Sequence, residues 1–114
     1  MSRELEDRFR QFAIRVRDFC LQLNRDVINR EYISQLIRSS GSVAANYLEA
    51  SDSLGKMDEL MKLKISRREA KESMYWLQLI LVYEDGQLES ERQMLLSEAD
   101  QIKKILSAII QKCT

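Results

Sequence analysis

The fold is first indicated by residues 3–24, which read RELEDRFRQFAIRVRDFCLQLN. Apolar side chains recur there at alternating spacings of four and three residues, at Leu5, Phe9, Phe12, Val16, Phe19 and Leu23. Because an α-helix has about 3.6 residues per turn, this spacing places all of them on one face. We therefore predict an amphipathic helix over residues 3–24.

The composition favours helices along the whole chain. Among 114 residues there is no Pro and there are three Gly, and these two residues interrupt helices most often. The 45% hydrophobic content is enough for a core, and the 32% charged content suits a surface in water. The sequence has no apolar run long enough to cross a bilayer and does not open with a signal peptide. We therefore expect a cytoplasmic protein that does not enter a membrane.

Three further segments have the same helical period. They cover approximately residues 30–50, 58–84 and 90–113. Asn29 is the expected N-cap of the first, and Ser90 with Gln93 matches a capping box at the start of the last. Helices joined by such short connections pack antiparallel. We predict an all-α, antiparallel up-down-up-down four-helix bundle, with residues 1–114 as a single four-helix-bundle domain.

Small side chains fill the middle of the second predicted helix. They are Ser39, Ser40, Gly41, Ser42, Ala44 and Ala45. A Gly inside a helix costs about 1 kcal/mol relative to Ala, and close approach of a neighbouring backbone at Gly41 would compensate. A polar line runs beside them, through Ser39, Ser42, Asn46 and Glu49. This line is consistent with hydrogen bonds to another helix or subunit, and equally with exposure to water.

The third predicted helix carries the most concentrated basic patch of the chain. Its members are Lys64, Arg67, Arg68 and Lys71, which fall at i, i+3, i+4 and i+7 and so share one arc of the helix. Basic side chains on one helical face are candidates for contacts with nucleic-acid phosphates. Arg15 or Arg17 of the first predicted helix is a candidate for an additional contact.

Residues 74–83 are apolar around nearly the whole of the predicted helix. Trp76, Leu79 and Tyr83 point away from its apolar seam. A bundle of 114 residues has no second layer to cover this back face, and large exposed apolar patches are rare on monomers. We therefore expect a homo-oligomer with these three residues as candidate interface residues. The polar line adds three more candidates, Ser42, Asn46 and Glu49.

The sequence contains no recognisable catalytic or metal-binding motif. It has no His, the commonest general base and metal ligand, and no Gly-rich phosphate loop or nucleophile elbow. Glu69 and Glu72 are either an acid pair or partners for neighbouring polar groups. Cys20 and Cys113 lie near opposite ends of the predicted bundle, which argues against an internal disulfide. We expect no enzyme activity, no cofactor and no metal.

Two segments carry a resemblance to a known family. Residues 35–50, QLIRSSGSVAANYLEA, resemble the second-helix signature of a bacterial family of four-helix-bundle proteins, and some members are encoded in intervening sequences of 23S rRNA genes. Asp58 and residues 62–77, KLKISRREAKESMYWL, resemble its third-helix signature. The resemblance implies an antiparallel bundle, a ring of five subunits and no established catalytic activity. It also implies similarity in fold to the accessory variability determinant of diversity-generating retroelements, a pentamer that binds nucleic acid and a reverse transcriptase.

Three functional hypotheses follow from these observations. The preferred one is a non-enzymatic homo-oligomer, a pentamer on the strength of the resemblance, that binds RNA or DNA through the basic arc. The zero net charge excludes a uniformly basic protein, but a basic face repeated around a ring still attracts phosphates. The alternative is a protein–protein interaction scaffold with no nucleic-acid binding. The third hypothesis is an enzyme with a carboxylate site at Glu69 or Glu72.

Overall fold

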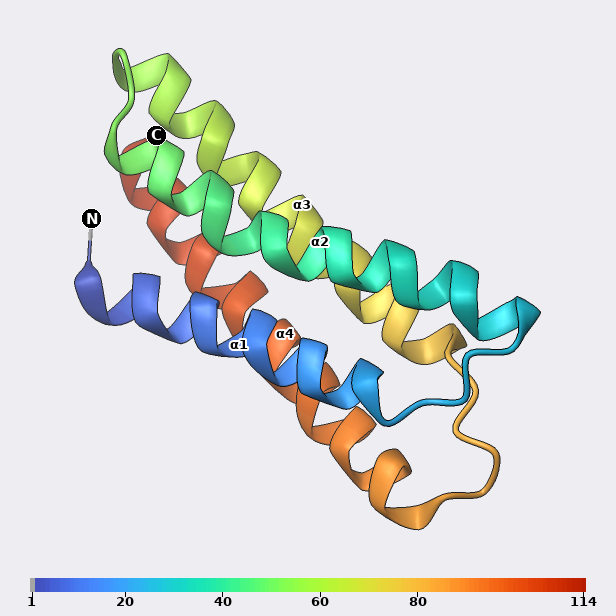
Figure 1. Ribbon diagram of the computed structural model, residues 1–114. Helices are drawn as coiled ribbons and strands as arrows, with labels where there is room; N and C mark the ends of the chain where they lie inside the picture. The colour runs from blue at the N-terminus through green and yellow to red at the C-terminus, as the bar shows by residue number, and fades with distance from the viewer. Residues whose placement is uncertain (1) are drawn as a thin grey trace.

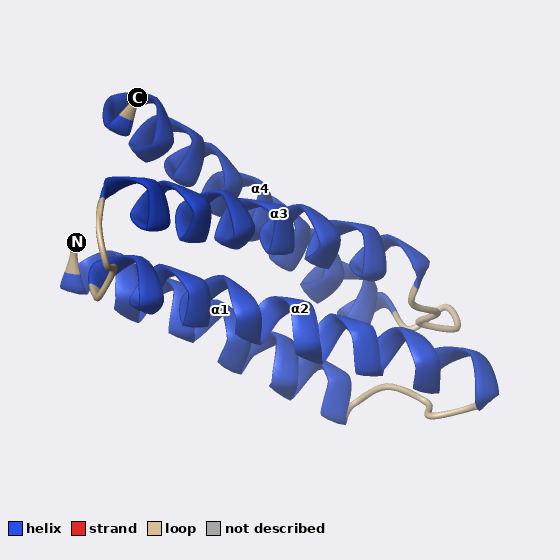
Figure 2. Cartoon of the chain, turned by 90° about the horizontal axis from the view of Figure 1, so that it is seen from above, coloured by secondary structure: helices blue, strands red, loops and turns tan. Residues whose placement is uncertain are grey.

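The structure, a computed structural model, describes residues 2–114 and contains four α-helices in that range (Figure 1). They are α1 (Arg3–Leu21), α2 (Val27–Ser51), α3 (Lys56–Leu79) and α4 (Gly86–Cys113). Successive helices run in opposite directions, and both chain ends lie at the same end of the bundle (Figure 2). The predicted all-α, antiparallel up-down-up-down bundle is confirmed.

The four helices pack in a ring around an elongated core. The most extensive contact joins α2 and α3, α4 packs beside α3, and α1 completes the ring by packing on α2 and α4. The molecule measures 46 × 22 × 19 Å along its principal axes. One consequence matters for function: α1 lies across the core from α3 and does not share a face with it.

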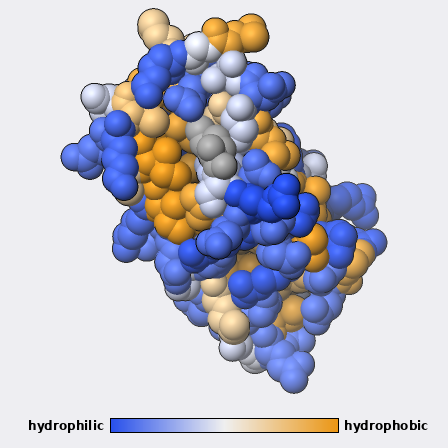
Figure 3. Space-filling model, turned by 90° about the vertical axis from the view of Figure 1, so that its left-hand side faces the viewer, coloured by the Kyte–Doolittle hydropathy of each residue, from blue (hydrophilic) through white to orange (hydrophobic). Residues whose placement is uncertain are grey.

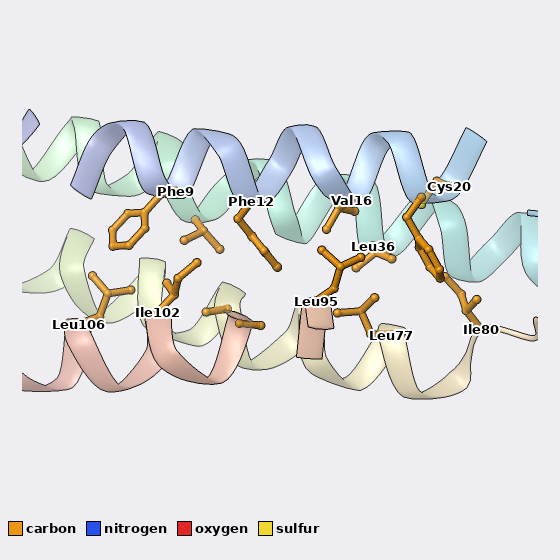
Figure 4. Packing of buried hydrophobic residues seen from close by; sticks show 14 of the residues in the cluster. Phe9, Phe12, Val16, Cys20, Leu36, Leu77, Ile80, Leu95, Ile102 and Leu106 are labelled. Carbon is orange, nitrogen blue, oxygen red and sulfur yellow. The ribbon is translucent and has the colours of Figure 1, made fainter. Parts of the chain in front are cut away.

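The apolar stripe of α1 faces the core as predicted. Phe9, Phe12 and Val16 are fully buried, and Figure 4 shows them pointing into the space between the helices, opposite Leu95 and Ile102 of α4. Full burial of one such side chain contributes about 1.5–3 kcal/mol. The stripe therefore attaches α1 to the rest of the bundle.

The starts of α2 and α4 differ from the prediction. Asp26, not Asn29, is the N-cap of α2, and its carboxylate accepts hydrogen bonds from two backbone N–H groups of the first turn at 3.1 and 2.9 Å. At α4 the N-cap is Asp85, not Ser90, and its carboxylate makes two such bonds, both of 3.0 Å. Asp caps a helix as well as Asn or Ser does. The earlier start of α4 also brings Leu88 into the helix, where it is buried.

Asn29 has a different role, which joins the two connections at one end of the bundle. Its side chain is fully buried. The amide nitrogen donates to the backbone oxygens of Asn24 and Leu81, both at 2.9 Å, and the amide oxygen accepts from the backbone nitrogen of Leu81 at 2.9 Å. Asn29 therefore ties the connection before α2 to the connection after α3. We call this set of three hydrogen bonds the Asn29 clasp.

α3 ends at Leu79, earlier than the predicted end at Glu84. The guanidinium of Arg92 on α4 donates to the backbone oxygens of Leu77, at 3.3 Å, and of Ile80. These bonds satisfy carbonyls at the end of α3 that have no helical partner, so the chain can leave the helix there.

The chain from residue 80 to residue 85 is therefore a connection and not a helical turn. Val82 is buried, whereas Tyr83 and Glu84 have positive φ angles of 51° and 64°. The hydroxyl of Tyr83 donates to the carboxylate of Asp26. The prediction of a helix over residues 74–83 is therefore wrong for residues 80–83. Tyr83 lies on a loop and not on the expected back face of the helix.

The small residues of α2 pack on α3, but not at Gly41. Gly41 is exposed, and a Cβ atom built there would meet nothing within 4 Å. The expected close approach of a backbone at this position is wrong within the chain. The close contact lies on the other side of α2, where Ser66 Oγ of α3 donates to Val43 O at 2.7 Å and Ser73 Oγ donates to Ser39 Oγ at 3.0 Å.

The two cysteines form no disulfide with each other, as the sequence analysis expects. Cys20 and Cys113 are free thiols, and burial raises the pKa of Cys20 to about 12, which keeps it protonated and unreactive. In the part of the chain that the structure describes, no helix has the length and apolarity needed to span a bilayer.

Candidate functional site

A groove between α3 and α4 collects the basic residues that the sequence singled out. It has a volume of about 780 Å³ and an apolar floor that includes Leu60 and Ile65. Five cationic side chains line it, from Lys64, Arg67, Arg68, Lys71 and Lys103. No acidic side chain lines it among residues 2–114. We call this the basic groove.

The packing of α3 explains why these cations face outward. The opposite side of the helix is buried, with Leu63, Ser66, Ala70, Ser73 and Leu77 fully enclosed. The serine bonds to α2 hold that side in a fixed register. Side chains on the remaining arc must therefore face solvent, and Lys64, Arg68 and Lys71 are exposed.

Lys64, Arg67, Arg68 and Lys71 differ from most other basic residues of the chain because they have no acidic partner. Within residues 2–114 no carboxylate lies at ion-pair distance from any of them, whereas Lys62 pairs with Glu49 at 3.1 Å. Arg67 donates one hydrogen bond, from Nη1 to Ser107 Oγ of α4 at 3.3 Å. Four of the five groove cations therefore have no ion-pair partner among the described residues, on a chain with zero net charge.

Lys103 is the groove residue that the sequence reasoning missed. It lies on α4 and contacts Asp100 of its own helix at 3.4 Å. Its place beside α3 depends on how the two helices pack, and no spacing in the sequence reveals it. The two suggested helpers on α1 are not part of the groove: Arg15 contacts Glu91 at 3.3 Å and Arg17 contacts its neighbour Asp18 at 3.1 Å.

Glu69 and Glu72 bind the same guanidinium on α2. Arg38 Nη1 lies 2.7 Å from Glu69 Oε2, and Arg38 Nη2 lies 2.7 Å from Glu72 Oε2. The Glu69 side chain is 7% exposed. Hydrogen bonding with Glu69, and then the Arg38 guanidinium, hold the pKa of the Glu72 carboxyl below its ordinary value. This geometry is that of an ion-pair cluster between α2 and α3, as the structural interpretation of the two acids expects.

No other acidic cluster suggests metal chemistry. Over residues 2–114, no group of three or more His, Cys, Asp or Glu side chains is placed to hold a metal ion.

A second groove adjoins the basic groove on the α2 side of α3. Its volume is about 480 Å³, and it is lined by Gln35, Arg38, Arg68, Lys71, Glu72, Tyr75 and Trp76. Trp76 packs between two tyrosines, with ring centroids 6.1 Å from Tyr32 of α2 and 5.0 Å from Tyr75. The indole Nε1 of Trp76 is buried without a hydrogen-bond partner. We call this the aromatic groove.

The six candidate interface residues do not lie together. Trp76 and Leu79 are half-buried near the C-terminal end of α3, and Tyr83 is exposed on the following connection. Ser42, Asn46 and Glu49 lie along α2, farther toward its C-terminal end.

The polar line on α2 divides into two kinds of contact. Ser39 and Glu49 bond to α3, as the hypothesis of hydrogen bonds to another helix expects. Ser42 donates to Arg38 O at 2.9 Å and Asn46 donates to Ser42 O at 2.8 Å, so both bonds stay within α2. The side chains of Ser42 and Asn46 therefore make their hydrogen bonds within α2 and not to another helix.

Comparison with known proteins agrees with this fold. The model of the family described as 23S rRNA-intervening sequence protein matches residues 4–108. A crystal structure of a protein of unknown function from the S23 ribosomal protein family of Bacteroides thetaiotaomicron is similar, with a TM-score of 0.79 and 28% sequence identity. The similarity covers 93% of this chain and 97% of that one. A comparison with curated proteins finds no match.

Proposed function

We propose that this chain, which belongs to the family of 23S rRNA-intervening sequence proteins, is a non-enzymatic cytoplasmic protein that binds RNA or another nucleic acid. The basic groove is the proposed binding surface. The observation that carries the proposal is that Lys64, Arg67, Arg68 and Lys71 lie together in one groove with no acidic partner among the described residues.

Electrostatics supports this proposal. Like charges at i, i+4 on a helix repel by about 0.2–0.5 kcal/mol per pair, and Lys64–Arg68 and Arg67–Lys71 are such pairs. A row of phosphates would relieve this repulsion and would release counterions on binding. Such binding reads charge and not base sequence, so we expect weak sequence preference and a steep dependence on salt concentration.

We propose further that the chain acts as a homo-oligomer, and the resemblance to its family suggests a pentamer. Ile37 and Leu48 support an oligomer because they are exposed apolar side chains on the outer face of α2. Gly41 lies between them on that face and leaves room for a close neighbour. An assembly would repeat the basic groove and so strengthen binding to a long polyanion.

The binding proposal is tested by charge reversal on α3. We expect wild-type protein to bind a fluorescently labelled RNA at low salt, measured by anisotropy. The double variant Lys64→Glu/Arg68→Glu should bind about tenfold or more weakly, and the slope of log K against log salt should fall by about two units. Both positions are exposed, so the helices should survive, which circular dichroism verifies.

The matched control is Arg17→Glu/Arg25→Glu. It changes the net charge by the same amount, but on α1 and on the connection after it. We expect this control to bind nearly as tightly as the wild type. Equal weakening by the two double variants, or no binding at low salt, would contradict the proposal.

An exposed apolar patch favours a second candidate function, a protein-binding scaffold. Leu54 and Met57 beside the α2–α3 turn are 96% and 85% exposed, and Met61 follows on the same face of α3. Figure 3 views this end of the molecule and shows apolar surface broken by hydrophilic side chains. A pull-down from nuclease-treated extract that recovers one protein, and loses it with Met57→Glu, would support this function.

A further inference from the structure

The basic groove and the aromatic groove form one continuous surface across α3. Arg68 and Lys71 line both of them. Tyr75 follows Lys71 by four residues and Arg68 by seven, so its ring continues the same face of the helix. A ligand that lies along the cations therefore reaches Tyr75 after one further helical turn.

Tyr75 presents an aromatic surface to this path. Its side chain is 54% exposed, and its ring rests at 68° on Trp76, with the ring centroids 5.0 Å apart. Trp76 in turn packs on Tyr32 of α2. The exposed ring therefore packs on Trp76, which is itself backed by Tyr32.

Arg38 forms another wall of the aromatic groove. Glu69 and Glu72 both hold its guanidinium at 2.7 Å, which fixes the orientation of this planar group. The same contacts pair Glu72, the acidic residue that lines this groove, with Arg38, and the three charged groups together keep one net negative charge. A planar guanidinium and a tyrosine ring are the two kinds of side chain on which unpaired bases stack.

We propose that the joined grooves form a site for single-stranded nucleic acid, with phosphates along Lys64, Arg68 and Lys71 and one unpaired base stacked on Tyr75. The inference rests on the proposed function and adds to it the class of nucleic acid. A duplex presents phosphates but keeps its base faces stacked inside, so it can use the cations and not the ring. A single strand can use both.

The test compares Tyr75→Ala with Tyr75→Phe. Tyr75 is exposed and lies outside the buried core, so we expect both variants to fold. We expect Tyr75→Ala to weaken binding of a single-stranded RNA by about 5- to 100-fold, the effect of losing one base–aromatic stack. Tyr75→Phe keeps the ring and should retain nearly wild-type affinity. Duplex RNA of equal length should bind all three proteins alike.

Two further probes separate stacking from charge and RNA from DNA. An abasic oligonucleotide of the same length carries the phosphates without the bases, and we expect it to bind as weakly to wild type as the intact strand binds to Tyr75→Ala. Trp76 is the single Trp of the chain and contacts Tyr75, so its fluorescence reports whether a base binds at the Tyr75 ring. Its emission should change with the intact strand and not with the abasic one. Single-stranded DNA should bind about as tightly as single-stranded RNA, because the ring and the cations contact groups that both nucleic acids share.

The outcomes distinguish the two proposals. Equal affinity for intact, abasic and duplex probes, combined with sensitivity to Lys64→Glu/Arg68→Glu, would overturn the stacking site and leave the basic groove in place. No affinity for any of the probes at low salt would overturn both. Wild-type affinity of Tyr75→Ala for the single strand would overturn the stacking site alone.

Discussion

Asn29 connects two loops that are far apart in the sequence and adjacent in the fold. Its amide meets the backbone of Leu81, 52 positions away, with both its oxygen and its nitrogen. A fully buried amide that makes three hydrogen bonds is stabilising only while all of its partners are present. The clasp therefore sets the position of residues 80–85 as well as the start of α2.

Removal of this side chain should be costly. We expect Asn29→Ala to lower the free energy of unfolding by about 1–3 kcal/mol, because the backbone groups of Asn24 and Leu81 lose the hydrogen bonds that the fully buried Asn29 side chain makes to them. Urea denaturation measures the change. Asn24→Ala is the matched control, since its side chain is exposed and the bond at this position comes from the backbone. Similar losses from the two variants would contradict the role given to the clasp.

At the residue scale, the sequence predicted that a side chain caps α2 and that basic residues share one face of α3, but it did not identify every residue correctly. Asn29 was expected as a helix cap because Asn is a common N-cap residue, yet Asp26 three positions earlier serves equally well. The choice between them depends on Leu81, which lies on another element. The four cations of α3 were identified correctly because their spacing alone places them on one arc, whereas Lys103 required knowledge of how α3 and α4 pack.

At the scale of elements, α2 has two unlike faces. The inner face packs small polar side chains closely on α3, through Ser39 and its bond from Ser73. The outer face carries Gly41 between Ile37 and Leu48, with open space around it in the isolated chain. Among residues 2–114 no atom lies within 4 Å of a Cβ built at Gly41, so no close contact there compensates for a Gly in the middle of this helix.

A substitution at Gly41 tests whether another subunit covers the outer face of α2. In an isolated chain, Gly41→Ala should raise the free energy of unfolding by about 0.5–1 kcal/mol, because Ala favours the helix and meets no neighbour. Thermal unfolding followed by circular dichroism measures the effect. A loss of stability instead would mean that another subunit approaches the outer face of α2 closely. Ala45→Gly, at an exposed position one turn away, should have the opposite sign.

The helical period of the sequence was sufficient to predict all four helices. The residues at which the helices begin and end were harder to predict. The pattern of residues 74–83 continues the helical period, so the sequence alone extends α3 to Glu84. The helix instead ends at Leu79, because Arg92 of α4 binds the last carbonyls of α3. This is a tertiary contact, and a reading of one helix at a time has no access to it.

At the scale of the whole molecule, zero net charge conceals an uneven distribution. The basic groove lies on the α3–α4 side, whereas arginines on α1 are paired with acids such as Glu98 and Glu91. Neutral proteins with one uncompensated basic surface attract polyanions at short range and lose that attraction as salt rises. Overall charge is therefore a poor guide to what this chain binds.

The proposed assembly is also tested at this scale. Light scattering should give a mass several times the 13.4 kDa of the chain. Ile37→Glu/Leu48→Glu should reduce the mass to that of one chain while circular dichroism remains unchanged, because both side chains are exposed in the isolated subunit. The control Val27→Glu/Ile28→Glu places two charges at exposed apolar positions at the other end of α2 and should leave the mass unaltered. A mass of 13.4 kDa for wild type at every concentration would contradict the assembly.

The Asn29 clasp has a consequence for how the bundle opens. It closes one end, where the α1–α2 and α3–α4 connections meet, whereas the other end contains both chain termini and the α2–α3 turn (Figure 1). Thermal fraying should therefore begin at the end with the termini and proceed toward the clasp. The basic groove extends from Met57 near the fraying end to Lys71 near the middle of the molecule. A ligand bound along it would hold α3 against α4 where the bundle is loosest.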